Sequence, residues 1–245
     1  MQDANENRQS GRRAVVFGAT GGIGHALCEA LSGEGWRVAA VSRRGAELAC
    51  ADLSFTCDMA DETSIAAVAD RLRDEPPSLV VVATGVLTLS DGTGPERSLR
   101  HIDGEAMAEA FRVNTIGPAL IAKHMLPLFA REGEGVFAAL GARVGSIGDN
   151  RLGGWHSYRA SKAALAMLIR NFAIETRRTH PGLVVIGLHP GTVDTPLSEP
   201  FQRNLPDGQL TGPRVAAEHL LRVIAGAKPE KSGAVLDWKG DIVPP

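Results

Sequence analysis

Tyr158 and Lys162 are four residues apart, in a segment, 155–168, that is rich in helix formers. On a helix, residues at this spacing lie on one face, one turn from each other. An ammonium beside a phenol favours the phenolate, so Lys162 is expected to lower the pKa of Tyr158 from about 10 toward neutrality. Such a pair can exchange a proton with a carbonyl oxygen. For the isolated pair, a phenol on a helix face and a solvated lysine is the simpler alternative.

A second group of residues points to a nucleotide. The apolar run 14–17 leads into a glycine-rich turn, and the residues that follow have helical spacing. Residues without a Cβ let a diphosphate approach the unpaired N–H groups at a helix N-terminus. The order Gly18-x-x-x-Gly22-x-Gly24 departs from the general G-x-G-x-x-G fingerprint. A tight turn without a ligand therefore remains an alternative for this loop alone.

The choice between the two nicotinamide dinucleotides is usually made where the second strand of such a fold ends. Here the apolar run 36–41 ends at Ser42, Arg43 and Arg44. An acidic side chain at this point binds the ribose 2′-OH of NAD, whereas a basic one accommodates the 2′-phosphate of NADP. The sequence thus predicts NADP(H) rather than NAD(H), with two solvated surface arginines as the alternative.

The elements that must position these residues alternate between strand and helix. Apolar runs predict strands at 14–17, 36–41, 53–57, 79–83, 135–140, 183–188 and 234–236. Because the chain lacks hairpin signals, we expect a Rossmann-type, doubly wound parallel sheet of about seven strands with helices on both faces. Its ligand crevice would lie beyond the carboxyl ends of the strands.

Three further segments have distinct predictions. The helical stretch 103–125 carries Asn114, and Gly117-Pro118 is expected to bend it. The polar segment 1–12 is predicted to be disordered, which leaves 13–245 as a single dinucleotide-binding domain. Within that domain the region 196–212 is rich in turn formers and is interpreted as a substrate lid.

Composition excludes several classes of function. Among 245 residues, 26 basic and 28 acidic side chains give a formal net charge of −2 without long charge runs, so no nucleic-acid partner is expected. The 3 cysteines lack the spacing of a metal site or a disulfide framework, which predicts a reducing, cytoplasmic location and no bound metal. No segment of signal-peptide or membrane-span type is present, so no membrane partner is expected.

Together these residues resemble the short-chain dehydrogenase/reductase family over nearly the whole chain. Gly18, Gly22 and Gly24 fit its T-G-x-x-x-G-x-G loop, and Tyr158 with Lys162 fits its Y-x-x-x-K pair. The resemblance implies that Asp58 contacts the adenine and that the segment Pro190–Thr195 binds the nicotinamide amide. It also implies that a helix disruption at Asn114 holds a water in a proton relay. The implied cofactor-binding residues are Gly18, Thr20, Gly22, Ile23, Gly24, Ser42, Arg43, Asp58, Thr84, Gly85, Tyr158, Lys162, Pro190, Gly191, Val193 and Thr195.

The chain departs from the family pattern in two places. After the fourth strand the usual N-N-A-G is replaced by Val82-Ala83-Thr84-Gly85. The usual serine pair of the fifth strand falls on Gly141-Ala142, neither of which can donate a hydrogen bond to a carbonyl. Ser146, 12 residues before Tyr158, is the nearest hydroxyl and is the candidate replacement. The predicted catalytic set is therefore Tyr158, Lys162, Asn114 and Ser146.

Within the family, residues 142–147 and 155–162 look similar to the C-factor-like and carbonyl reductase subgroup. The resemblance implies an NADP(H)-dependent oxidoreductase that transfers a hydride between nicotinamide and a small carbonyl or secondary alcohol. It also implies a homodimer or homotetramer, formed through the helices that carry Asn114 and Tyr158. The missing serine beside an intact cofactor loop leaves an alternative, a catalytically impaired NADP(H)-binding module that acts in signalling.

Overall fold

The computed structural model describes residues 12–89, 91–206 and 208–245. The predicted disordered segment 1–12 lies outside this range except for Arg12, whose guanidinium carbon lies 4.4 Å from the centroid of the Trp36 ring. In the described part of the chain, no helix has both the length and the apolar character required to cross a bilayer.

One sheet of 7 parallel strands forms the centre of the protein, in the order β3-β2-β1-β4-β5-β6-β9. The strands are β1 (Arg13–Phe17), β2 (Arg37–Ser42), β3 (Leu53–Thr56), β4 (Leu79–Val82), β5 (Gly135–Leu140), β6 (Leu183–His189) and β9 (Val235–Asp237). β1 pairs with both β2 and β4, so the strand order reverses beside β1. The prediction of a doubly wound parallel sheet is confirmed.

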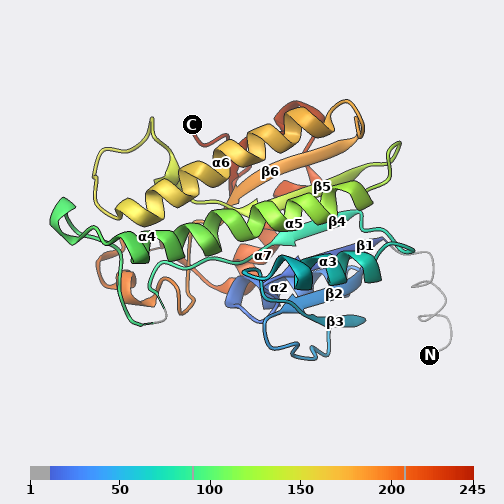
Figure 1. The fold of residues 1–245 in the computed structure, drawn as a ribbon, viewed down its shortest axis with the longest axis horizontal. Coiled ribbons are helices and arrows are strands. Elements are labelled where there is room, and N and C mark those ends of the chain that lie inside the picture. The colour runs from blue at the N-terminus through green and yellow to red at the C-terminus, as the bar shows by residue number, and fades with distance from the viewer. Residues whose placement is uncertain (1–11, 90, 207) are drawn as a thin grey trace.

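Helices cover both faces of this sheet. They are α2 (Gly22–Gly33), α3 (Glu62–Arg71), α4 (Gly104–Phe111), α5 (Gly117–Met125), α6 (His156–Thr176) and α7 (Pro213–Ala225). Figure 1 shows α3, α5 and α6 over one face, while α2 and α7 pack together on the other. The core therefore has two halves, one on each side of the strands.

Burial on both faces explains why the strands are almost continuously apolar. In β1, Val15 and Phe17 enter the core under α3, α5 and α6, whereas Ala14 and Val16 enter the core under α2 and α7. All residues of β1 and β4 are buried, as is usual for parallel strands that are covered on both faces. The carboxyl ends of these strands are consequently fixed by packing, which also fixes where the loops that follow them begin.

The helical segment 103–125 is interrupted at Asn114, as the family resemblance implies, and not at Gly117-Pro118. A single π turn, Arg112–Ile116, separates α4 from α5, and Asn114 is at its centre. Pro118 instead occupies the start of α5, where its missing N–H costs little. The wide turn rather than Gly117-Pro118 breaks the helix, and π turns are often associated with functional sites.

The segment predicted as a lid has local structure. Its backbone forms a short helical turn, Glu199–Asn204, and strand β8 (Leu210–Thr211), which pairs with β7 (Thr192–Val193). After β9 the chain reverses, and Ile242 forms an antiparallel bridge with Leu236. This reversal places Pro245 against the loop that follows β5.

Candidate active site

The glycine loop between β1 and α2 is packed so closely that side chains are excluded. Gly18 has φ of 83°, and a Cβ at Gly24 would lie 2.1 Å from the Gly18 carbonyl oxygen. A Cβ at Gly22 would lie 2.7 Å from Cγ2 of Thr195. These close approaches explain the glycine spacing, and they bring Thr195 from the distant end of the chain onto the loop. Ile23, in the first turn of α2, packs against the neighbouring core.

A cavity of about 850 Å³ opens in front of this loop, between the carboxyl ends of β1, β2 and β4. The predicted cofactor residues in its wall are Gly18, Thr20, Ser42, Arg43, Asp58, Thr84 and Gly85. Thr84 Oγ1 is buried there with no hydrogen-bond partner among the described residues. A buried hydroxyl without a partner is uncommon in proteins and is satisfied when a polar ligand binds. The wall residues and their chemistry therefore fit a nucleotide.

Some polar groups around this cavity are hydrogen-bonded within the protein, whereas others are free to contact a ligand. The Ser42 hydroxyl is buried and accepts a hydrogen bond from Ala46 N at 3.3 Å. Asp58 Oδ1 accepts from Ala60 N at 2.9 Å, which fixes the turn after β3. Arg43 is exposed and forms no ion pair within the described residues. Its guanidinium is thus available to an anionic group in the cavity.

The predicted pair of Tyr158 and Lys162 lies on one face of α6, as expected. Lys162 is buried, and its Nζ donates to Leu140 O at 2.8 Å and lies 5.8 Å from the centroid of the Tyr158 ring. Burial lowers the pKa of Lys162 from its ordinary value near 10.5 to about 8.

The expected direction of the Tyr158 pKa shift is wrong for this structure. Burial raises the pKa of Tyr158 to about 12, because an ionised phenol loses its hydration in this position. The ammonium of Lys162 is directed to the Leu140 carbonyl and does not offset this effect. At neutral pH the Tyr158 hydroxyl is therefore protonated.

Asn114 links this pair to the loop after β4. Its Oδ1 accepts from Val86 N and its Nδ2 donates to Val86 O, each at 2.9 Å. Nδ2 also donates to Ser161 Oγ on α6 at 3.1 Å. The side chain is entirely buried and is fully occupied by these contacts, so it fixes two elements rather than presenting a free amide.

Gly85 is the point where these elements meet. A Cβ at this position would lie 3.3 Å from Asn114 Oδ1, 3.5 Å from Lys162 Nζ and 4.0 Å from Leu197 Cδ1. The loop after β4, the π turn, α6 and the start of the lid segment thus converge beside the cavity. The retained glycine of the altered V-A-T-G sequence therefore lies where a side chain would be in close contact with Asn114.

The other predicted cofactor residues lie in the segment after β6. Gly191 has φ of 79°, a conformation that favours glycine, and follows Pro190 directly. Val193 is buried in β7. Thr195 Oγ1 donates to Val193 O at 3.3 Å while its methyl group faces Gly22. The segment therefore lies over the N-terminus of α2, as its predicted role requires.

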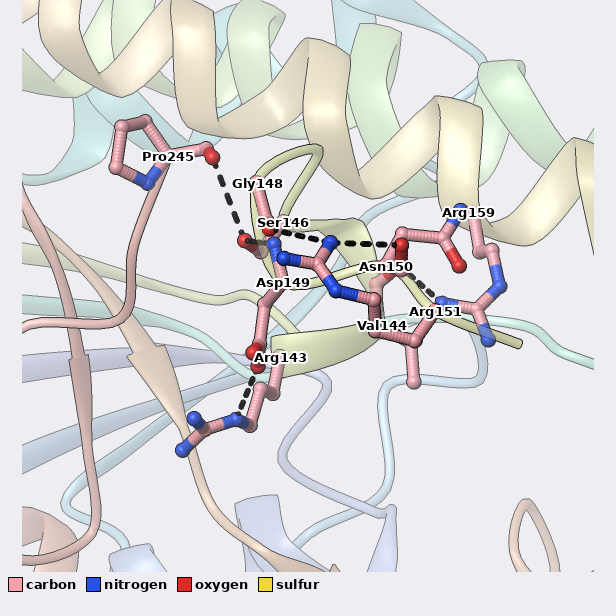
Figure 2. Close-up of polar contacts among 9 residues, drawn as sticks. All are labelled: Arg143, Val144, Ser146, Gly148, Asp149, Asn150, Arg151, Arg159 and Pro245. Atoms are coloured by element: carbon pink, nitrogen blue, oxygen red, sulfur yellow. Dashed lines mark hydrogen bonds and ion pairs between the residues drawn. The ribbon is translucent and has the colours of Figure 1, made fainter. Parts of the chain in front are cut away.

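Ser146, the predicted replacement for the missing catalytic serine, is hydrogen-bonded within its own loop and to the C-terminal residue. Its hydroxyl accepts from Asp149 N at 3.0 Å and donates to Pro245 O at 3.4 Å (Figure 2). Arg143 Nε pairs with Asp149 Oδ2 at 2.6 Å and closes the same loop. None of the hydrogen bonds described for Ser146 reaches Tyr158 or Lys162, so its geometry favours a role in loop structure over carbonyl polarisation.

Two residues near Tyr158 were not found from the sequence. Trp155 lies edge-on to Tyr158, with ring centroids 6.2 Å apart, and its centroid is 5.0 Å from that of Phe201 in the lid segment. Glu96, in the long connection between β4 and α4, is buried against the start of α6. The signal for Trp155 was its place at a helix start, whereas nothing near Glu96 in the sequence indicates this contact.

The buried charge of Lys162 predicts a pH-dependent cost in stability. A lysine whose folded pKa lies below its unfolded pKa destabilises the folded protein fully below pH 8, and this cost vanishes as pH rises toward 10.5. The shift in the Lys162 pKa corresponds to a destabilisation of about 3 kcal/mol. A variant without the ammonium is relieved of this cost but loses the hydrogen bond to Leu140, which is worth about 1 kcal/mol. We expect Lys162→Met to unfold at higher urea concentration than wild type at pH 7, with a smaller difference at pH 10. The exposed Lys228→Met is the control, and a difference that grows with pH would contradict the expectation.

Comparison with known proteins agrees with this geometry. The sequence profile of the short chain dehydrogenase family matches residues 12–206. A 1-hydroxy-2-glutathionyl-2-methyl-3-butene dehydrogenase from Rhodococcus sp. (strain AD45) is 34% identical over 224 residues, which cover 89% of this chain and 93% of the relative. The C-signal protein of Myxococcus xanthus is 36% identical over 147 residues, 60% of this chain and 83% of that protein.

Solved structures give the same result. The structure of NADPH-bound carbonyl reductase from chicken fatty liver has a TM-score of 0.81 at 27% identity, covering 96% of this chain and 99% of that one. These findings support oxidoreductase function, and nothing in them favours the alternative of an impaired signalling module. From the match to the family profile, together with the glycine loop and the Tyr158–Lys162 pair on α6, we conclude that the chain belongs to the short-chain dehydrogenase family.

Proposed function

We propose that this protein is an NADP(H)-dependent reductase of small carbonyl compounds. The observation that carries the proposal is the convergence of Tyr158, Lys162 and Asn114 beside a cavity whose wall fits a nucleotide. The glycine loop, Thr84, Asp58 and the segment Pro190–Thr195 would hold the cofactor. When bound, the nicotinamide supplies or accepts the hydride at the carbonyl carbon.

Tyr158 donates the proton in this proposal. A phenol whose pKa is raised to about 12 is protonated near neutrality, so its proton is present for transfer to the substrate oxygen, although the raised pKa also makes it a weaker acid than free tyrosine. This protonation state is the one that carbonyl reduction requires, because the oxygen takes up a proton as the carbon accepts the hydride. Lys162, whose pKa is about 8, can exchange a proton near neutral pH. Its Nζ and Asn114 Oδ1 both lie beside Gly85. The two residues thus supply a donor and a means of restoring its proton.

Arg43 supports NADP(H) over NAD(H). It lines the cavity after β2, and the structure gives it no ion pair within the described ranges. We expect Arg43→Ala to weaken NADPH binding at least tenfold, about the effect of losing one charged hydrogen bond to a phosphate, while NADH binding changes little. Fluorescence titration with each cofactor measures this. Arg131→Ala, at an exposed position before β5, is the control; equal weakening of both cofactors would exclude selection by Arg43.

Three further properties are proposed, namely the oligomeric state, the substrate lid and the cellular location. The π turn before α5 exposes Ile116, and α6 exposes Met167 and Ile174, with exposed fractions of 50%, 62% and 60%, which favours association of two or four copies through this region. Sedimentation velocity measures this directly. The packing of Phe201 on Trp155 favours 196–212 as the substrate lid. The described cysteines are all free, which is consistent with a cytoplasmic location.

The test of the proposed function is NADPH oxidation by the wild-type protein against a panel of ketones, aldehydes and quinones. Turnover that requires Tyr158 supports a reductase. A protein that binds NADPH but turns over no member of the panel contradicts the proposal for these substrate classes.

A further inference from the structure

The start of helix α6 is conformationally strained. Its first residue is preceded by Gly153, Gly154 and Trp155, all in the left-handed region with φ of 63°, 64° and 50°. A bulky residue with positive φ is unfavourable and persists only where its surroundings fix it. Tyr158 follows Trp155 by three residues, so the contacts that fix this start also fix the position of the phenol.

Glu96 provides those contacts. Its carbonyl oxygen accepts from Trp155 N at 2.6 Å, and its carboxylate accepts from Ser157 N at 3.3 and 3.1 Å through its two oxygens. The Ser157 hydroxyl also donates to the carboxylate. Only 7% of Glu96 is exposed. A carboxylate at a helix N-terminus satisfies free N–H groups and interacts favourably with the helix dipole.

The carboxylate is charged, and Glu96 lines the same small cavity as Tyr158. Although burial raises the pKa of Glu96, the hydrogen bonds from Ser157 outweigh this effect and hold the pKa below its usual value, with a contribution from His156. Glu96, Ser157 and Tyr158 line one small cavity of about 30 Å³. Displacement of the Glu96 side chain would therefore open space beside the Tyr158 ring.

We propose that Glu96 is a positioning residue that fixes the first turn of α6 and thereby the Tyr158 hydroxyl. Only the expected effect of Glu96 on kcat rests on the proposed role of Tyr158 as proton donor. The structural part of the inference, that Glu96 keeps the turn carrying the phenol in place, is independent of any substrate. Glu96 itself acts through Ser157 and Trp155, and it contacts Tyr158 neither as acid nor as base.

The test uses the fact that the chain contains 1 tyrosine. With [¹³Cζ]tyrosine incorporated, a single NMR resonance reports the ionisation of Tyr158, and steady-state kinetics with NADPH report kcat and KM. Glu96→Ala should lower kcat about 10- to 100-fold, the cost of a misplaced catalytic group, while the Kd for NADPH changes less than about twofold. Water reaching the ring should bring the Tyr158 pKa from about 12 toward 10.

Two variants separate positioning from general stability. Glu96→Gln keeps an acceptor oxygen for Ser157 and should recover most of kcat and most of the pKa shift. Asp61→Ala removes a comparable helix cap, the contact from Asp61 Oδ1 to Thr63 N at 2.9 Å on α3, and should lower the melting temperature without changing kcat or the Tyr158 resonance.

Each outcome has a definite meaning. If Glu96→Ala leaves both kcat and the Tyr158 pKa unchanged, the inference is overturned although the enzyme is active. If wild type shows no turnover but the Tyr158 pKa still falls in Glu96→Ala, the positioning role stands and the proposed function fails. If Glu96→Ala does not fold, Ser157→Ala replaces it, and an unchanged kcat together with an unchanged Tyr158 pKa in that variant overturns the inference.

Discussion

Tyr158→Phe is expected to lower kcat for carbonyl reduction by about 10²- to 10⁴-fold, the range for loss of a general acid. The phenylalanine ring fills the same space beside Trp155 and retains the contact at the face of α6. The hydroxyl, whose pKa of about 12 keeps it protonated at neutral pH, is the group removed. The Kd for NADPH should therefore change far less than kcat, and the measurement is NADPH oxidation with a ketone that wild type reduces.

The matched control for this variant is Thr176→Val. It removes a buried hydroxyl from the C-terminal end of the same helix, where Oγ1 donates to Phe172 O at 2.7 Å. Turnover within about twofold of wild type is expected, because Val is close in shape to Thr and the site is distant. Equal activity of Tyr158→Phe and wild type would exclude Tyr158 as the proton donor.

Gly24→Ala is expected to abolish cofactor binding. The added methyl carbon would lie 2.1 Å from Gly18 O and 2.8 Å from Gly18 C, and backbone atoms cannot move aside as a side-chain end can. The loop must open, which displaces the N–H groups that face a diphosphate. We expect at least a hundredfold weaker NADPH binding, measured by fluorescence titration, with a lower melting temperature as overpacking adds strain.

Gly33→Ala is the matched control, since it adds the same methyl group to the same helix. A Cβ at Gly33 meets no atom within 4 Å. Replacing a helical glycine with alanine stabilises a helix by about 0.5 to 1 kcal/mol. The control should bind NADPH normally and melt no lower than wild type. Normal NADPH binding by Gly24→Ala would show that the loop does not hold the diphosphate.

The fold and the close packing of the glycine loop could be predicted because their signals are local. Strands buried on both faces must be apolar along their length, as 79–83 is, and glycines that cannot carry a side chain leave a spacing that is visible in the sequence. The pair Tyr158 and Lys162 could be found for the same reason, because helical periodicity places them on one face.

The remaining features depend on contacts between distant segments. The pKa of Tyr158 reflects burial by neighbours that the sequence does not place beside it, and the Lys162 ammonium is directed to Leu140, which is remote in sequence. The hydrogen bond of Ser146 to Pro245 arises from the chain reversal after β9. The contact of Glu96 with Ser157 likewise joins a loop to the start of a helix 61 residues away, so no local motif indicates it.

The contact of Thr195 with Gly22 also constrains when the protein becomes functional during synthesis. Domains are translated from the N-terminus, and pairings between distant segments form slowly because a long loop must close first. The glycine loop leaves the ribosome early, but the residue that packs against it, Thr195, is translated much later. A nascent chain therefore carries an incomplete cradle for most of its translation, and a dinucleotide can stabilise only the finished domain.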